Sequence, residues 1–186
     1  MALHSAERRT FLKTSLGASA VFAIPTIIPS TAFGANEKII TGHIGVGGRG
    51  GGNLRSFLNH AAAVCDVDST RVARAVKQVE NAGRTCTGHG DFRELLDRSD
   101  LDAVVISTPD HWHAPAAILA CDAGKHVYVE KPCSHNVREG RLLVEAARTY
   151  RRIVQHGTQM RSSQVTAQAG KVLASGILGT VKMSKA

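Results

Sequence analysis

"KIITGHIGVGGRGGGNLRSFLNHAAAVCDVDSTRV", residues 38–72, decides the fold of this chain. Its apolar run, 39–46, predicts a buried strand that turns through glycines into a helical pattern with Leu54 and Phe57 on one face. A second short strand is expected at 61–65. The order strand, glycine turn, helix and strand predicts the beginning of a parallel α/β sheet.

The glycines of this turn have a recognisable spacing. Gly45, Gly47 and Gly50 match G-x-G-x-x-G, the pattern of a loop that holds a dinucleotide pyrophosphate at a helix N-terminus. Glycine suits these positions because the turn needs unusual φ values and because a Cβ would keep the backbone away from the phosphates. Further glycines nearby raise the chance that composition alone produces the match, so the pattern depends on its context.

An acid at the end of the second strand supplies that context. Asp66 follows Gly45 by twenty-one residues, close to the separation at which an acid reaches the adenosine ribose hydroxyls. Asp68 is a rival for that role. The alternative is that both acids only start the next helix, with Asp68 or Ser69 as its N-cap.

The same acid bears on the choice of cofactor. A carboxylate at Asp66 repels the 2′-phosphate of NADP and bonds well to a free ribose hydroxyl, so we expect NAD to be favoured over NADP. Two cations nearby, Arg49 and Arg71, could nevertheless receive that phosphate.

Strands and helices continue to alternate along the remaining chain. Helical patterns and short apolar runs predict helices at 72–79, 92–96, 114–123 and 137–150 and strands at 103–107, 126–129 and 153–155. This alternation predicts a Rossmann-like, doubly wound parallel sheet with helices on both faces and a site at the carboxyl ends of its strands. Glu130-Lys131-Pro132 follows the strand at 126–129 and therefore belongs to that same edge.

Four stretches in this order, "GVGGRG", "CDVD", "STPDHWHAP" and "VYVEKP", resemble the glucose-fructose oxidoreductase, inositol dehydrogenase and MocA family, written Gfo/Idh/MocA. The resemblance covers about residues 38–182. It implies a nicotinamide-binding Rossmann domain followed by a C-terminal α/β domain, acting on sugars, cyclitols or their derivatives. The resemblance is also compatible with a homo-oligomer.

The resemblance implies a role for each matching position. The pyrophosphate and adenosine ribose would be held by Gly45, Gly47, Gly48, Arg49, Gly50 and Asp66. The middle of the cofactor and its nicotinamide side would be lined by Thr108, Pro109, Asp110, His111 and His113. Glu130 and Lys131 match the family's Glu-Lys-Pro signature, and Gln159 lies where related chains reach back to the cofactor.

Lys131 is the expected catalytic residue. A cation facing the nicotinamide and a substrate hydroxyl can orient the oxygen and stabilise developing alkoxide charge. The alternative is a surface ion pair with Glu130, but neighbouring residues on a strand point to opposite faces.

Other classes of site fit the composition poorly. His111 and His113 lack an acid or cysteine partner at metal-site spacing, so no metal is expected. Cys65, Cys86, Cys121 and Cys133 match neither paired metal ligands nor a disulfide scaffold and are expected to be free thiols. The net charge of +8 is dispersed and aromatics make up only 4%, which argues against a nucleic-acid partner.

The first 35 residues resemble a bacterial twin-arginine export signal. Arg8 and Arg9 precede a mildly apolar stretch, 14–28, and small residues offer a cleavage site near Ala35. A transmembrane anchor is the alternative, but the stretch is short and contains glycine and prolines. We therefore expect export by the twin-arginine machinery to the periplasm or the extracellular space, without a stable membrane anchor.

The expected domains are a signal at 1–35, a Rossmann domain at 36–157 and the beginning of a substrate domain at 158–186. The last segment supplies a predicted helix at 165–174 and a strand start at 180–183. In the resembled family the substrate pocket belongs to the second domain, so we expect a truncated chain that binds its cofactor but does not turn over alone. A nucleotide-binding module without activity is the alternative.

Overall fold

The computed structural model describes residues 38–183, and its centre is a six-stranded, fully parallel sheet. The strand order is β3-β2-β1-β4-β5-β6. The strands are β1 (Thr41–Ile44), β2 (Ala61–Cys65), β3 (Thr87–His89), β4 (Ala103–Ile106), β5 (His126–Val129) and β6 (Val154–His156). This order is that of the Rossmann fold, so the predicted fold class is confirmed.

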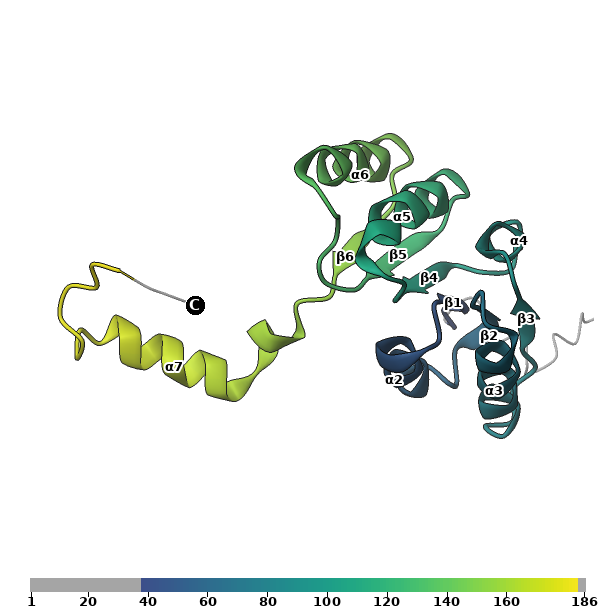
Figure 1. Cartoon of the computed structure of the whole chain (residues 1–186), viewed down its shortest axis with the longest axis horizontal. Coiled ribbons are helices and arrows are strands. Elements are labelled where there is room, and N and C mark those ends of the chain that lie inside the picture. Colours follow the sequence, from purple (N-terminus) through teal and green to yellow (C-terminus); the bar gives the residue numbers. More distant parts are fainter. Residues whose placement is uncertain (1–37, 184–186) are drawn as a thin grey trace, which may run out of the picture. The chain divides into compact units, whose positions relative to one another are not determined.

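Helices cover both faces of the sheet, as Figure 1 shows. One face carries α2 (Gly48–Ser56) and α3 (Ser69–Glu80), and the other carries α4 (Phe92–Leu96), α5 (His113–Asp122) and α6 (Val137–Thr149). Each face buries its own apolar cluster, one around Leu54 and Val64 and the other around Leu95 and Ile106. Both faces of the central strands are therefore removed from water, which explains the continuous apolar sequences of β2 and β4.

The strand order reverses between β1 and β4. β1 pairs with β2 on one side and with β4 on the other, so the chain leaves these two strands in opposite directions at the carboxyl edge of the sheet. Gly45 follows β1 and Ser107 follows β4 at this edge. A parallel sheet opens a crevice for ligands at such a switch point.

The predicted elements are largely confirmed. β2, β5 and α4 have the predicted bounds, and the other predicted strands and helices of the sheet differ by a few residues at their ends. α7 (Gln164–Ala174) also forms, preceded by the 3₁₀ turn η4 (Gln159–Ser162).

The strand start predicted at 180–183 is wrong, because no strand forms there in the described structure. A strand is stable only when its backbone pairs with a neighbour, and no neighbouring strand lies beside this segment in residues 38–183. The apolar side chains around it, Val172, Leu173, Ile177 and Leu178, are exposed.

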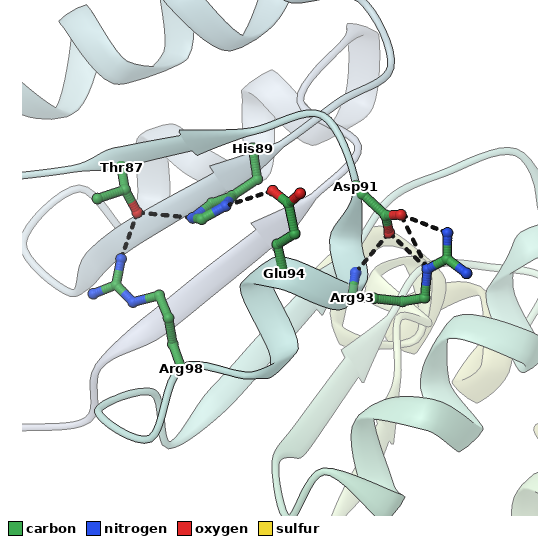
Figure 2. A network of polar contacts seen from close by, with 6 residues as sticks. All are labelled: Thr87, His89, Asp91, Arg93, Glu94 and Arg98. Atoms are coloured by element: carbon green, nitrogen blue, oxygen red, sulfur yellow. Dashed lines mark hydrogen bonds and ion pairs between the residues drawn. The ribbon is translucent and has the colours of Figure 1, made fainter.

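The edge strand β3 was not predicted. Its sequence, Thr-Gly-His, has no apolar residue, and a polar network holds it in place, as Figure 2 shows. The Thr87 hydroxyl lies 3.0 Å from His89 Nε2 and accepts a hydrogen bond from Arg98, while His89 Nδ1 lies 3.4 Å from a Glu94 oxygen. Arg98 also donates to the Ala62 carbonyl, which ties this network to β2.

All four cysteines are free thiols, as predicted. Burial raises the pKa of Cys65 to about 12 and that of Cys86 to about 11, so both thiols stay protonated at neutral pH. No helix in the described part of the chain is long and apolar enough to cross a membrane. The expected export signal lies outside the described residues.

Candidate functional site

The glycine loop joins β1 to α2 at the switch point. Gly45 has a φ of +80°, and a Cβ there would lie 2.8 Å from the backbone of Ser107. At Gly50 the constraint is steric, because a Cβ would lie only 1.8 Å from the Gly45 carbonyl oxygen. These two glycines let α2 start close against β1, with Gly47 as its N-cap and no side chain capping its first amides. The first turn of α2 can therefore present its N–H groups to a phosphate.

Asp66 is buried and bonded to the glycine loop. Its Oδ2 accepts from the Val46 N–H at 3.0 Å, and its Oδ1 accepts from the Asp68 N–H at 3.1 Å. Each carboxylate oxygen can accept a second hydrogen bond, so the group can still receive ribose hydroxyls while it fixes the loop.

Asp68 has the capping role instead. It is the N-cap of α3, and its carboxylate accepts from the N–H groups of Thr70 and Arg71. These hydrogen bonds, that from the Thr70 hydroxyl first, lower the pKa of Asp68. Asp68 is therefore the cap of the helix, and it lines neither cavity.

A cavity of about 480 Å³ opens beside the loop and Asp66; we call it the first cavity. It reaches from the glycines at the start of α2, across the carboxyl ends of β1, β2 and β4, to the turn before α5. Its lining includes Gly45, Gly47, Gly48, Arg49, Asp66, Val67, Arg71, Phe92, Thr108, Pro109, His111 and Trp112. The predicted pyrophosphate and ribose residues thus lie in one cavity, with the exception of Gly50, which packs behind the loop.

A second cavity of about 260 Å³ lies at the ends of β4 and β5. It is lined by Arg49, Ser107, Thr108, His113, Glu130, Lys131 and Gln159. Arg49, Ser107 and Thr108 line both cavities, so the two are neighbours along the carboxyl edge of the sheet. Five predicted cofactor residues therefore meet beside the expected catalytic Lys131.

The buried carboxylate of Glu130 ties α2 to β5. It accepts from Arg49 Nε at 3.0 Å and from Asn53 Nδ2 at 3.1 Å, two side chains one helical turn apart on α2. Burial by itself raises the pKa of Glu130, but the hydrogen bonds from Asn53 and Arg49 outweigh it, and the net shift is downward. Glu130 is thus held ionised and paired with Arg49 rather than with Lys131.

Arg49 also contacts Gln159, a residue that lines the second cavity. With its amide oxygen toward Arg49, Gln159 accepts from Arg49 Nη2 at 2.8 Å and donates to the Gly157 carbonyl at 2.9 Å. Of the two cations that could receive a 2′-phosphate, Arg71 is the one beside Asp66, with Nη1 3.8 Å from Oδ1.

Lys131 and His113 both line the second cavity, but they differ in exposure and in contacts. Lys131 is exposed at its mouth, at the cis Lys131–Pro132 peptide. His113 is buried, and its ring spans the carbonyl oxygens of Thr108 and Pro132, which joins the loop after β4 to the loop after β5. Lys131 can therefore meet a ligand, whereas His113 holds the loops.

Three observations test whether these residues fit a bound dinucleotide. The loop backbone is accessible at Gly48, where an added Cβ would have no other atom within 4 Å. Asp66 has lone pairs available in the same cavity. Thr108 lines both cavities, and its buried hydroxyl has no hydrogen-bond partner among residues 38–183. A dinucleotide spanning both cavities can supply that partner, so the residues fit.

Two of the predicted cofactor residues, Gly50 and Asp110, line neither cavity, and two aromatic lining residues were not predicted. Asp110 lies outside the lining of both cavities, and its carboxylate contacts His111 and His135 at 3.7 Å instead. Phe92 and Trp112 were not singled out as cavity residues because their apolar side chains carry no chemical signature. No group of three or more His, Cys, Asp or Glu residues able to hold a metal occurs in the described part of the chain.

Residues 40–158 match the family model described as an oxidoreductase family with an NAD-binding Rossmann fold. This chain belongs to the Gfo/Idh/MocA family. The match runs from the strand before the glycine loop to just past β6, and NAD is the cofactor of the fold it defines.

Similar proteins and solved structures agree with this family assignment. A glycosyl hydrolase family 109 protein of Saccharopolyspora erythraea is 34% identical over 192 residues, covering 89% of this chain and 41% of the relative. The WlbA dehydrogenase of Chromobacterium violaceum, solved with NADH and UDP-GlcNAcA, has a TM-score of 0.65 at 26% identity, covering 76% of this chain and 41% of the other. The myo-inositol 2-dehydrogenase of Lactobacillus plantarum shares the fold with a TM-score of 0.67 at 23% identity, covering 77% and 43%. This chain thus spans about two fifths of the length of each relative.

Proposed function

We propose that the chain binds NAD across the two cavities, as the cofactor-binding part of an oxidoreductase that acts on sugars, cyclitols or their derivatives. The adenosine half would lie in the first cavity and the nicotinamide half in the second. The position of Asp66 carries this proposal, because its buried carboxylate lies beside the glycine loop at the end of β2. The substrate class is supported by the WlbA dehydrogenase, whose structure holds the sugar nucleotide UDP-GlcNAcA.

Lys131 would act on the substrate oxygen. Bound NAD accepts or returns a hydride, and the protein must orient the carbon and oxygen that exchange it. The Lys131 ammonium at the mouth of the second cavity can donate to that oxygen and stabilise its developing negative charge. Since Glu130 is already bonded to Arg49 and Asn53, it leaves the Lys131 charge free for this role.

A second candidate is hydrolysis of a glycoside with NAD retained. The name of the Saccharopolyspora relative, a family 109 glycosyl hydrolase, favours it. In such a reaction the hydride removed from the sugar is returned to it, so no reduced cofactor accumulates. Because this chain is expected not to turn over alone, the test uses a full-length relative such as the Saccharopolyspora protein. With aryl glycosides and NAD, release of the phenol without net reduction of NAD supports hydrolysis, and net reduction with a free sugar or cyclitol supports the oxidoreductase.

Replacement of Asp66 by alanine should weaken NAD binding about 10-fold or more, because hydrogen bonds to a charged carboxylate are lost. NADP should be weakened less, since the same change removes a negative charge next to its 2′-phosphate and leaves Arg71 nearby. Equilibrium dialysis with both cofactors gives the ratio of the two affinities. That ratio is informative even if the loop loosens, because loosening affects both cofactors.

Asp68→Ser is the matched control. It keeps an oxygen at the N-cap of α3 and leaves Asp66 in place, so the preference for NAD should persist. Equal weakening of NAD and NADP by Asp66→Ala would mean that Asp66 serves only the loop.

We also propose that the chain is exported through the twin-arginine pathway, on the strength of Arg8, Arg9 and the apolar stretch after them. A change of Arg8 and Arg9 to lysines should leave the protein in the cytoplasm at its full length. The original chain should be found outside the cytoplasm and shortened near Ala35. Fractionation of expressing cells with mass determination checks this, and normal processing of the lysine variant would contradict it.

A further inference from the structure

Trp112 is the single tryptophan of the chain, and it lines the first cavity. It closes the 3₁₀ turn η3 (Asp110–Trp112) that leads into α5. Its side chain is 47% exposed, although tryptophan carries the largest apolar surface of any residue. An aromatic surface left open inside a ligand cavity is available for stacking.

The orientation of Trp112 is fixed from one side by Phe92. The two rings meet edge to face, with centroids 6.0 Å apart and an interplanar angle of 67°. Phe92 itself is packed against the core cluster on its face of the sheet. The His111 ring also lies beside the indole, with centroids 6.4 Å apart, and about half of Trp112 stays exposed.

Phe92 is in turn held by the cap of α4. Figure 2 shows Asp91, the N-cap residue, bonded to the backbone and the guanidinium of Arg93. These hydrogen bonds, chiefly from the Arg93 side chain, lower the pKa of Asp91 to about 2. The cap therefore persists across the physiological pH range and fixes where the chain enters the helix that carries Phe92.

Polar and apolar side chains of the first cavity suit the two parts of an adenosine. Asp66 and Arg71 line it at the end of β2, where the ribose is expected. Phe92 and Trp112 line it with Val67, which is almost fully exposed. Within residues 38–183 no carboxylate other than Asp66 lines the cavity, and these three apolar side chains offer a surface for a flat, uncharged ring.

We infer that Trp112 stacks on the adenine ring of the cofactor and makes the first cavity selective for adenine nucleotides. This inference rests on the proposed binding of NAD and specifies which residue holds its adenine. Stacking of a base on an aromatic side chain stabilises binding enough to change an affinity about tenfold. Trp112 is thus a specificity-determining residue for the cofactor, and it lines the first cavity, whereas Lys131 lines the second.

The test uses tryptophan fluorescence, excited where tyrosine does not absorb, which reports Trp112 alone because it is the single tryptophan. Addition of NAD, ADP-ribose or AMP should change the emission, because each carries adenine, whereas nicotinamide mononucleotide should leave it unchanged. Trp112→Leu should weaken NAD and ADP-ribose about tenfold in equilibrium dialysis, and Trp112→Phe should restore most of the affinity. Tyr150→Leu, at the C-cap of α6 and outside both cavities, is the control and should bind as the original chain does.

The outcomes separate this inference from the proposed function. If NAD binds by dialysis but the fluorescence is unchanged, or if Trp112→Leu binds normally, the adenine lies elsewhere and the inference is wrong while NAD binding stands. A response to nicotinamide mononucleotide instead of AMP would reverse the orientation of the cofactor and also overturn it. Absence of NAD uptake by the folded chain overturns both.

Discussion

Gly50→Ala should destabilise the chain by about 3 kcal/mol or more and abolish measurable NAD binding. The new Cβ would lie 1.8 Å from the Gly45 carbonyl oxygen, far inside any contact distance. That oxygen belongs to the backbone of the glycine loop, so the clash cannot be relieved by a rotamer change. Either α2 or the loop must move, and both shape the first cavity.

Gly52→Ala is the matched control on the same helix. A Cβ there would meet only the end of the Arg55 side chain, at 3.8 Å, and Gly52 lines neither cavity. Alanine is favoured over glycine in a helix by up to about 1 kcal/mol, so this variant should be as stable as the original chain or more so. Denaturant unfolding and NAD dialysis of both variants check the pair; a Gly50→Ala chain with unchanged stability would contradict the described packing of α2 on β1.

Acidification from pH 7 to pH 5 should remove about 2 kcal/mol of stability through one histidine, His43. Its side chain is buried on β1, and burial lowers its pKa from 6.5 to about 4. Between these values the unfolded chain takes up a proton that the folded chain does not. Stability therefore falls as the pH drops below 6.5, by about 3 kcal/mol in total when pH 4 is reached.

The surroundings of His43 explain why it stays neutral. Nε2 lies 3.1 Å from the Thr41 hydroxyl, and Nδ1 has no partner in the described structure. The ring packs on Phe57, with the two ring centroids 5.8 Å apart. Within residues 38–183 no carboxylate is bonded to the ring to stabilise a positive charge. His43→Leu should abolish most of the loss between pH 7 and pH 5. Urea unfolding at both pH values measures it, and an equal loss in the variant would show that other groups are responsible.

Prediction from sequence succeeded where one pattern dominated. Buried parallel strands are short apolar runs ended by glycine or a charged residue, so β2 and β5 were found with correct bounds. The strand β3 escaped because it is held by side-chain hydrogen bonds of Thr87 and His89 rather than by apolar burial. The segment 180–183 has strand-like residues, but pairing with a neighbour, which local sequence does not encode, decides whether a strand forms.

Some residues of the candidate site were likewise predictable from the sequence, and others were not. Gly45, Gly50 and Asp66 were predictable because backbone geometry and ribose recognition demand particular residue types at a known spacing. The direction of the Arg49 side chain was not predictable, because it depends on Glu130, eighty-one positions away in the chain. Trp112 was missed for a related reason: its contact with Phe92 exists only after β3, α4 and η3 are in place.

Equilibrium dialysis of the folded chain against NAD tests the central claim most directly. With folding verified by circular dichroism, the chain should take up one NAD per molecule, saturate below millimolar concentration and lose this uptake in Gly50→Ala but not in Gly52→Ala. No uptake of NAD at millimolar concentration by the folded chain would contradict the proposed site.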